Sequence, residues 1–200
     1  MARPRSAGFD GQREQIHAAA ARLFATRGYT ASTMNEVAAA CGVGKATLYH
    51  YVRDKHDLLA QITSAHVARL EGLVQAVRAQ RLAPEVHLQA LIARFMQAYA
   101  SAEHEHRVLT EDVKFLAEAE REAVLAAQRR VVRAFADAVA ALRPDLRSAA
   151  LDKPLAMLLF GMINWTFTWL RRDGPLSHET LAPVVTALFF GGLPAVSAQP

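Results

Sequence analysis

A short run of polar side chains follows a glycine-containing turn near the start of this 200-residue chain. Residues 42–59 have the sequence GVGKATLYHYVRDKHDLL, in which Lys45, Tyr49 and His50 fall within two helical turns. Ammonium, hydroxyl and imidazole groups at this spacing can bind phosphate oxygens and the hydrogen-bonding edges of bases. The same groups are common on any solvated helix surface, so the composition of the run leaves both interpretations open.

The surrounding residues predict two short helices joined by a turn and preceded by a longer helix. Residues 11–27 place apolar side chains on one stripe, as a scaffolding helix does. Thr33 and Glu36 match a capping box at the start of a second helix, which we expect to end at Gly42. A third helix follows over residues 45–52. This order is that of a helix-turn-helix, whose last helix enters the major groove of DNA.

The predicted recognition helix, residues 45–52, has an apolar and a polar side. Leu48 and Val52 turn towards the core. The groove-facing side carries Lys45, Ala46, Tyr49 and His50. A small residue such as alanine lets the helix approach the groove closely. Groups suited to the phosphates are the hydroxyls of Thr47 and Tyr49, the ammonium groups of Lys45 and Lys55, and the free amides near Thr33.

Composition and charge narrow the class of protein. The net charge is +4, and residues 1–60 carry +3 of it, which suits an anionic partner. A single cysteine, Cys41, excludes an internal disulfide and a CxxC metal site. Because no apolar run reaches the roughly 18 residues of a membrane span and no signal peptide is visible, we expect a cytoplasmic protein that does not contact a membrane.

Catalytic and metal motifs are not found in the sequence. His104 and His106 in the stretch EHEH point about 200° apart on a helix, so they cannot share a metal ion without help. No GxSxG, P-loop, GxGxxG or HExxH pattern occurs. We therefore expect neither an enzyme nor a bound cofactor or metal.

Helical periodicity runs through nearly the whole chain, which predicts an all-α protein of about nine helices. After the three helices above, we expect helices near residues 55–81, 85–102, 104–116, 119–142, 148–172 and 177–190. The expected organisation is a flexible arm (1–9), a helix-turn-helix domain (10–56), a larger effector-binding and dimerisation domain (57–192) and a fraying tail (193–200).

The first third of the chain resembles the DNA-binding domain of TetR-type (TetR/AcrR) transcriptional regulators. The segments ARLFATRGY, TMNEVAAACGV and KATLYHYV match that family in composition and spacing. Gly44, where a capping serine is common, and Val52, where phenylalanine is common, depart from the pattern. The resemblance implies that the following residues contact or approach the operator, mostly its phosphates: Thr33, Asn35, Lys45, Ala46, Thr47, Tyr49, His50, Tyr51 and Lys55.

Two apolar segments near the C-terminus predict a dimer interface. Residues 155–170, LAMLLFGMINWTFTWL, are apolar around nearly the whole helix, and residues 181–193 add a second apolar helix. A four-helix bundle made by two subunits would bury both helices, as the resemblance also implies. The alternative is a central core helix within one subunit.

An effector cavity would lie between the remaining helices. The candidate lining residues are Phe95, Met96, Tyr99, Leu109, Phe115, Phe135, Met157, Phe160, Asn164 and Trp165. The alternative for each of them is ordinary core, which such residues form more often than a ligand site. Asn164 is the stronger candidate, because a polar amide within an apolar helix needs a partner.

The second half of the chain also resembles the C-terminal domain of TetR-type regulators of fatty-acid, sterol and aromatic-acid breakdown. That resemblance implies an effector such as an acyl-CoA thioester. Arg129, Arg130 and Arg133 could bind its phosphates, or they could form a solvated helix face.

Together these patterns predict a homodimeric repressor that a small hydrophobic effector releases from palindromic double-stranded DNA. The alternative is a helical small-molecule-binding protein or enzyme whose basic surface is incidental.

Overall fold

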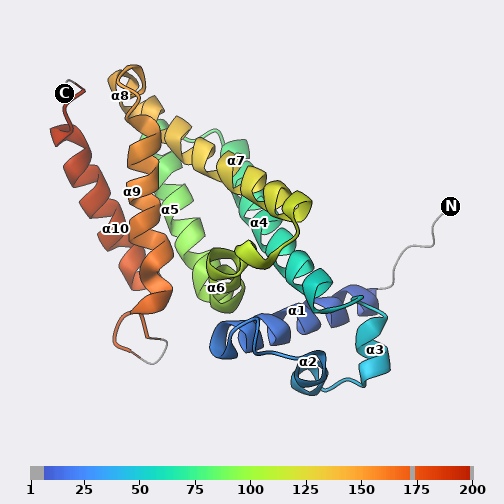
Figure 1. The fold of residues 1–200 in the computed structure, drawn as a ribbon. Helices are drawn as coiled ribbons and strands as arrows, with labels where there is room; N and C mark the ends of the chain where they lie inside the picture. The colour runs from blue at the N-terminus through green and yellow to red at the C-terminus, as the bar shows by residue number, and fades with distance from the viewer. Residues whose placement is uncertain (1–6, 172–173, 199–200) are drawn as a thin grey trace. The chain divides into compact units, whose positions relative to one another are not determined.

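The computed structural model describes residues 7–171 and 174–198, and every regular element within them is helical (Figure 1). The predicted all-α class is confirmed. The elements are α1 (Ala7–Arg27), α2 (Met34–Cys41), α3 (Lys45–Tyr49), α4 (Lys55–Ala79), α5 (Pro84–Ser101), α6 (Glu103–Glu111), α7 (Glu118–Leu142), α8 (Pro144–Ser148), α9 (Asp152–Asn164) and α10 (His178–Gly192), with short 3-10 helices η1 (Val113–Phe115), η2 (Trp165–Thr168) and η3 (Leu193–Ala195).

Packing divides the chain into two units, which are described separately. The first unit holds the described residues up to Val67 together with residues 104–124, and the second holds residues 68–103 with those from Leu125 onward. This division differs from the predicted boundary after residue 56. The first turns of α4, most of α6 and all of η1 belong to the same unit as the predicted helix-turn-helix.

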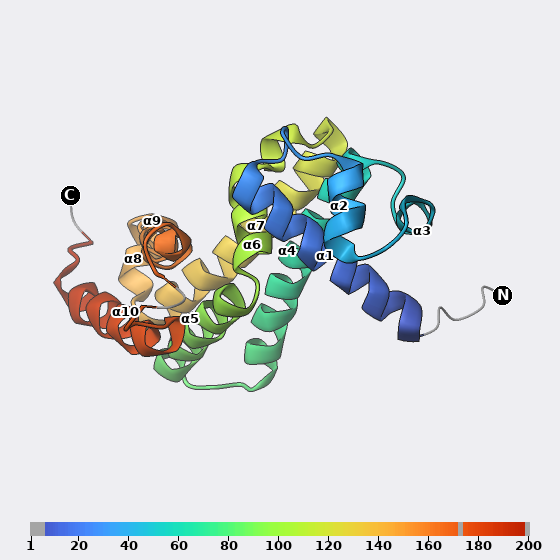
Figure 2. The same cartoon turned by 90° about the horizontal axis from the view of Figure 1, so that it is seen from below.

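In the first unit, α1 is the scaffold against which α2 packs (Figure 2). Ile16, Ala20 and Phe24 recur every four residues on α1 and are at most 1% exposed. Residues four apart lie on one face of a helix, so this stripe supplies the core. α1 starts at Ala7, and the predicted flexible arm is therefore wrong for residues 7–9. Residues 1–6 of that arm, with Arg3 and Arg5, lie outside the described residues.

The capping box predicted from Thr33 and Glu36 forms as expected. The Thr33 hydroxyl accepts a hydrogen bond from the Glu36 amide at 3.3 Å, and the Glu36 carboxylate accepts one from the Thr33 amide at 2.8 Å. At the start of α10, Ser177 and Thr180 exchange the equivalent pair of bonds. Local sequence therefore determines where these two helices begin.

Several predicted helix boundaries are wrong. The helix expected over residues 148–172 is replaced by the last residue of α8, a break, α9 and the 3-10 helix η2. Pro144 begins α8 instead of interrupting the chain, because the first helical turn does not use the N–H that proline lacks. Ala150 then adopts a left-handed φ of +58°, which ends α8 and separates it from α9. The extra helix α8 raises the number of α-helices in the described ranges from the expected nine to ten.

Two other helices end earlier than expected. α6 stops at Glu111, and the chain continues as the 3-10 helix η1 instead of remaining helical to residue 116. The recognition helix α3 ends at Tyr49 instead of residue 52. The expected end of the 148–172 helix falls on residue 172, which lies outside the described residues.

The second unit has an aromatic core. Phe95 of α5, Phe135 of α7 and Phe160 of α9 are at most 6% exposed. The ring centroids of Phe95 and Phe135 lie 4.8 Å apart, and those of Phe135 and Phe160 lie 4.7 Å apart. α10 packs along α5 and also contacts α9, as both views show. The aromatic cluster thus holds together α5, α7 and α9, which are far apart in the sequence.

The end of the chain is docked as far as Val196, so the predicted fraying tail is wrong for these residues. Leu193 is 6% exposed. The Arg143 guanidinium donates hydrogen bonds to the carbonyls of Leu193, Pro194 and Val196 at 2.8–3.4 Å. In the part of the chain that the structure describes, no helix has both the length and the apolar character needed to cross a bilayer.

Candidate nucleic-acid interface

The turn between α2 and α3 depends on a glycine. Gly42 has a φ of +65°, a left-handed conformation that L side chains rarely adopt. The amides of Gly42 and Val43 donate to the carbonyls of Ala39 and Ala38, each at 3.1 Å, which closes the end of α2. α3 begins three residues after Gly42 in this geometry, so the two helices are joined as in a helix-turn-helix.

α3 displays its polar side chains to solvent. Leu48 is fully buried and Val52, just beyond the helix, is 2% exposed, so these two hold the segment against the unit. The exposed side chains of α3 and the residue after it are Lys45, Ala46, Thr47, Tyr49 and His50. Five of the nine residues predicted to contact DNA therefore lie together on one exposed segment.

The start of α2 is less open to a phosphate than the sequence indicates. Thr33 and Asn35 are exposed, but the capping box already uses the amides of Thr33 and Glu36. Hydrogen bonds from Thr33 lower the pKa of the Glu36 carboxyl, which also pairs with Arg27. A phosphate at this helix start would meet the amides of Met34 and Asn35 beside a carboxylate.

Lys55 binds backbone carbonyls of its own chain. Its Nζ donates to the carbonyls of Tyr29 at 2.9 Å, Thr30 at 3.2 Å and Ser32 at 2.8 Å, and it lies 4.6 Å from the centre of the Tyr29 ring. An ammonium group has three protons, and these carbonyls use all of them. Phosphate binding by Lys55 stays a prediction. In the structure this side chain holds the loop between α1 and α2 through these hydrogen bonds.

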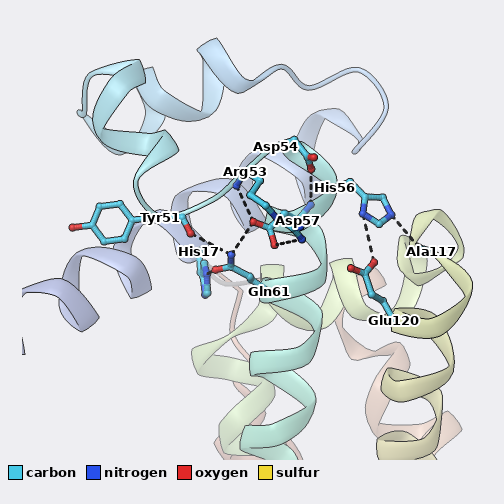
Figure 3. A network of polar contacts seen from close by, with 9 residues as sticks. All are labelled: His17, Tyr51, Arg53, Asp54, His56, Asp57, Gln61, Ala117 and Glu120. Carbon is cyan, nitrogen blue, oxygen red and sulfur yellow. Dashed lines mark hydrogen bonds and ion pairs between the residues drawn. The ribbon is translucent and has the colours of Figure 1, made fainter. Parts of the chain in front are cut away.

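Tyr51 is held from two sides. Its ring is half-buried and stacks on Phe9 of α1, with ring centroids 4.5 Å apart and planes inclined by 25°. Its carbonyl accepts a hydrogen bond from Gln61 Nε2 at 3.2 Å (Figure 3). Gln61 Oε1 in turn accepts from His17 Nε2 of α1 at 3.1 Å. Phe9, His17 and Gln61 could not be predicted as members of this site, because no short-range sequence pattern marks contacts between residues 10 to 44 apart.

A second polar link joins the start of α4 to the start of α7. His56 Nε2 accepts the Ala117 amide proton at 3.0 Å, and His56 Nδ1 lies 3.5 Å from Glu120 Oε2 (Figure 3). Because Nε2 is the acceptor, the imidazole proton sits on Nδ1 and faces the carboxylate. His56 therefore fixes the segment before α7 against the helix that follows the recognition segment.

The stretch EHEH contributes a buried histidine to the first unit. His106 is 4% exposed, and its Nδ1 lies 3.4 Å from Nε2 of His66, which is 3% exposed. Within residues 7–171 and 174–198, no group of three or more His, Cys, Asp or Glu side chains could hold a metal ion.

Of the ten candidate lining residues, eight belong to the second unit, and Leu109 and Phe115 belong to the first. Phe95, Tyr99 and Phe160 lie in the aromatic core of the second unit, where burial strongly raises the pKa of the Tyr99 phenol. Phe115 instead belongs to the first unit and stacks on Tyr29, with ring centroids 5.2 Å apart. The role of Phe115 as an effector-lining residue stays a prediction.

Met157 and Trp165 were predicted to line an interior cavity, but their side chains are 51% and 61% exposed. They lie on the outer side of α9 and η2, where an interior cavity cannot form. Asn164 differs from both, because its Oδ1 is buried and has no hydrogen-bond partner among the described residues. Arg130, proposed for a cavity mouth, pairs with Glu71 of α4.

A groove of about 910 Å³ lies between α5 and α10 in the second unit. Gln97 and Glu103 line one side, and His178, Thr186 and Phe190 line the other. None of the ten candidate lining residues lines this groove.

A group of large apolar side chains is exposed on α9, on η2 and the residue after it, and on α10. Its members are 50–65% exposed: Met157, Leu158, Trp165, Trp169, Val184 and Leu188. We call this group the apolar face. Large exposed apolar patches mark surfaces that bind another protein.

The fold and the exposed face of α3 define a DNA-binding protein of the helix-turn-helix class. Residues 16–62 match the model of the bacterial regulatory proteins of the tetR family, and residues 81–193 match a tetracyclin repressor-like C-terminal domain. The chain therefore belongs to the TetR family of transcriptional regulators. Regulators of this family bind operator DNA.

Individual relatives are similar over most of their length. The chain is 33% identical to a TetR-family transcriptional regulator from Bordetella parapertussis 12822, with a TM-score of 0.85 over 92% of this chain and 97% of that one. It is 26% identical to the transcriptional repressor KstR2 of Mycolicibacterium smegmatis, covering 91% of this chain and 90% of the relative. AibR, solved with isovaleryl coenzyme A and operator DNA, is 26% identical with a TM-score of 0.74, over 88% of this chain and 97% of AibR.

Proposed function

We propose that this chain is a homodimeric repressor that binds a palindromic operator through α3 and leaves it when an acyl-CoA thioester binds. The observation that carries the DNA part is the exposed polar segment of α3, anchored by the buried Leu48 and Val52. Lys45, Tyr49 and His50 contact base edges and phosphates, while Ala46 allows close approach. Thr33, Asn35 and Thr47 bind phosphates at the rim of the groove.

DNA binding by these residues predicts a steep dependence on salt. Lys45 and its neighbours replace cations condensed on the phosphates, and those cations are released on binding. For six or more phosphate contacts, affinity is expected to fall roughly 10³-fold between 50 and 200 mM salt. The measurement is fluorescence anisotropy with duplexes from the chain's own upstream region. Absence of binding at 50 mM salt would contradict the proposal.

The apolar face supports the dimer. In a two-fold interface the same patch from both subunits is buried, so α9 and α10 of each copy would form a four-helix bundle. Gly161 lies on this outer side of α9, and a Cβ built there meets nothing within 4 Å, so a second helix can approach closely. Two recognition helices would then enter major grooves one turn, or roughly 34 Å, apart.

The proposed effector binds at the aromatic core of the second unit. Its acyl chain separates Phe95 from Phe160, and the buried Tyr99 hydroxyl and Asn164 amide meet its polar thioester end. The similarity to AibR, which was solved with isovaleryl coenzyme A, supports this class of ligand. The core is filled by side chains in the present structure, so the effector favours a more open state and shifts the population towards it.

Effector binding is expected to stabilise the protein against heat. At a hundredfold excess of ligand over its Kd, mass action contributes about 2.7 kcal/mol, which raises the Tm by roughly 5–10 °C. A thermal-shift series with acyl-CoA esters of increasing chain length measures this, with free coenzyme A as the control. Equal shifts with free coenzyme A, or none with any ester, would contradict the acyl-CoA proposal.

A further inference from the structure

The recognition helix is too short to hold its own position. α3 has five residues, its N-cap Gly44 provides no side-chain hydrogen bond, and only Leu48 is buried from within it. A helix of one to two turns is unstable in isolation. Its orientation must therefore come from groups outside α3.

Gln61 of α4 supplies one such group, because a single amide joins three parts of the first unit. Its Nε2 donates to the Tyr51 carbonyl and to Asp57 Oδ2, each at 3.2 Å, and its Oε1 accepts from His17 of α1 at 3.1 Å (Figure 3). Asp57 also accepts the Arg53 amide proton at 2.8 Å. The segment that follows α3 is thus tied to both α1 and α4.

Phe9 supplies the second group. It lies at the start of α1 and stacks on the Tyr51 ring with a centroid separation of 4.5 Å. Phe9 of α1 therefore holds the Tyr51 ring, and Gln61 of α4 holds the Tyr51 carbonyl. Tyr51 follows His50 directly and lies two residues after Tyr49, so its position sets where these two side chains point.

We propose that Phe9 and Gln61 are positioning residues which brace the recognition helix in the orientation that binds DNA. This proposal rests on the proposed function of α3. Without the brace α3 samples several orientations, and binding has to select one of them at a cost in affinity. Loss of either contact is expected to weaken operator binding about tenfold, the effect of one hydrogen bond or ring contact.

The experiment compares the full-length variants Gln61→Met and Phe9→Leu with the wild-type protein. Methionine keeps the length of Gln61 without its hydrogen bonds, and leucine removes the Phe9 ring. Phe9→Tyr keeps the stacked ring and should restore wild-type behaviour. Gln75→Met, at an exposed position of the same helix α4, is the matched control.

Two measurements separate positioning from general stability. The first is the Kd for the duplex that the wild-type protein enriches from a random-sequence library, measured against salt. Its salt slope should stay unchanged, because neither residue contacts a phosphate. The second is native-state hydrogen exchange at the amides of His50, Tyr51 and Val52, which bond within α3 and its end. These amides should exchange about tenfold faster while those in the middle of α1 do not change.

Wild-type Kd and wild-type exchange in both Gln61→Met and Phe9→Leu would overturn the brace. Faster exchange throughout the first unit would also overturn it, since that result indicates a general loss of stability. If the wild-type protein enriches no duplex, the proposed function fails instead, and the exchange data still decide whether Phe9 and Gln61 hold α3.

Discussion

Replacing Leu158 with glutamate is expected to convert the protein from a dimer to a monomer. Leu158 is 65% exposed on α9, so a carboxylate there costs little in the single chain. In the proposed interface it would be buried without a partner, which costs about 3–5 kcal/mol. A two-fold interface contains the substitution twice, so dimer affinity should fall at least about 10³-fold. Sedimentation equilibrium at micromolar concentration measures the change.

Val86→Glu is the matched control for this variant. Val86 is 47% exposed at the start of α5, away from the apolar face, and its replacement should leave the dimer intact. Leu158→Glu should also lose operator affinity at least about 10²-fold, because one recognition helix must then bind alone. A Leu158→Glu protein that keeps the wild-type dimer affinity would show that α9 does not form the interface.

The parts of the fold that sequence predicts well are those with local signals. The stripe of Ile16, Ala20 and Phe24 identifies α1, and the reciprocal pair Thr33 and Glu36 locates the start of α2 within one residue. Each signal acts between residues three or four apart, so it survives without knowledge of the rest of the fold. Pro144 shows the limit of this approach, since proline can either break a helix or begin one.

The effector residues were harder to predict because α9 is apolar on every side. Phe160 and Met157 are equally apolar and three residues apart, yet Phe160 is 6% exposed and Met157 is 51% exposed. Periodicity identifies an inner face only where the outer face is polar. A helix that a second subunit covers, as proposed here for α9, lacks that contrast, so its sequence does not separate core from interface.

The polar contacts around α3 were invisible for a different reason. Gln61 and His17 are 44 residues apart, and Lys55 reaches carbonyls 23–26 residues before it. Side-chain type shows what a group can bind but not which partner the fold places beside it. The sequence therefore identified Lys55 as a cation near DNA and gave no indication of its intramolecular partners.

Lys55→Met is expected to lower stability and to weaken binding to all DNA sequences alike. Methionine keeps the apolar stem but leaves the carbonyls of Tyr29, Thr30 and Ser32 without their charged donor. Because a hydrogen bond to a charged group contributes about 1.5–3 kcal/mol and only Thr30 among the three residues is exposed, so that its carbonyl regains water, we expect a loss of at least about 2–3 kcal/mol. This corresponds to a Tm lower by roughly 4–12 °C. Differential scanning calorimetry and anisotropy on specific and random duplexes measure the two effects.

Lys45→Met is the comparison that makes this result decisive. Lys45 is exposed at the start of α3, so its loss should leave the Tm unchanged and reduce the slope of log Kobs against log salt by about 0.9, the effect of one phosphate contact. Lys55→Met should instead leave that slope unchanged. His50→Ala should alter base preference at one position of each half-site, with the Tm unaffected. A Lys55→Met protein with wild-type Tm and a slope reduced by about 0.9 would show that Lys55 binds a phosphate and not the loop before α2.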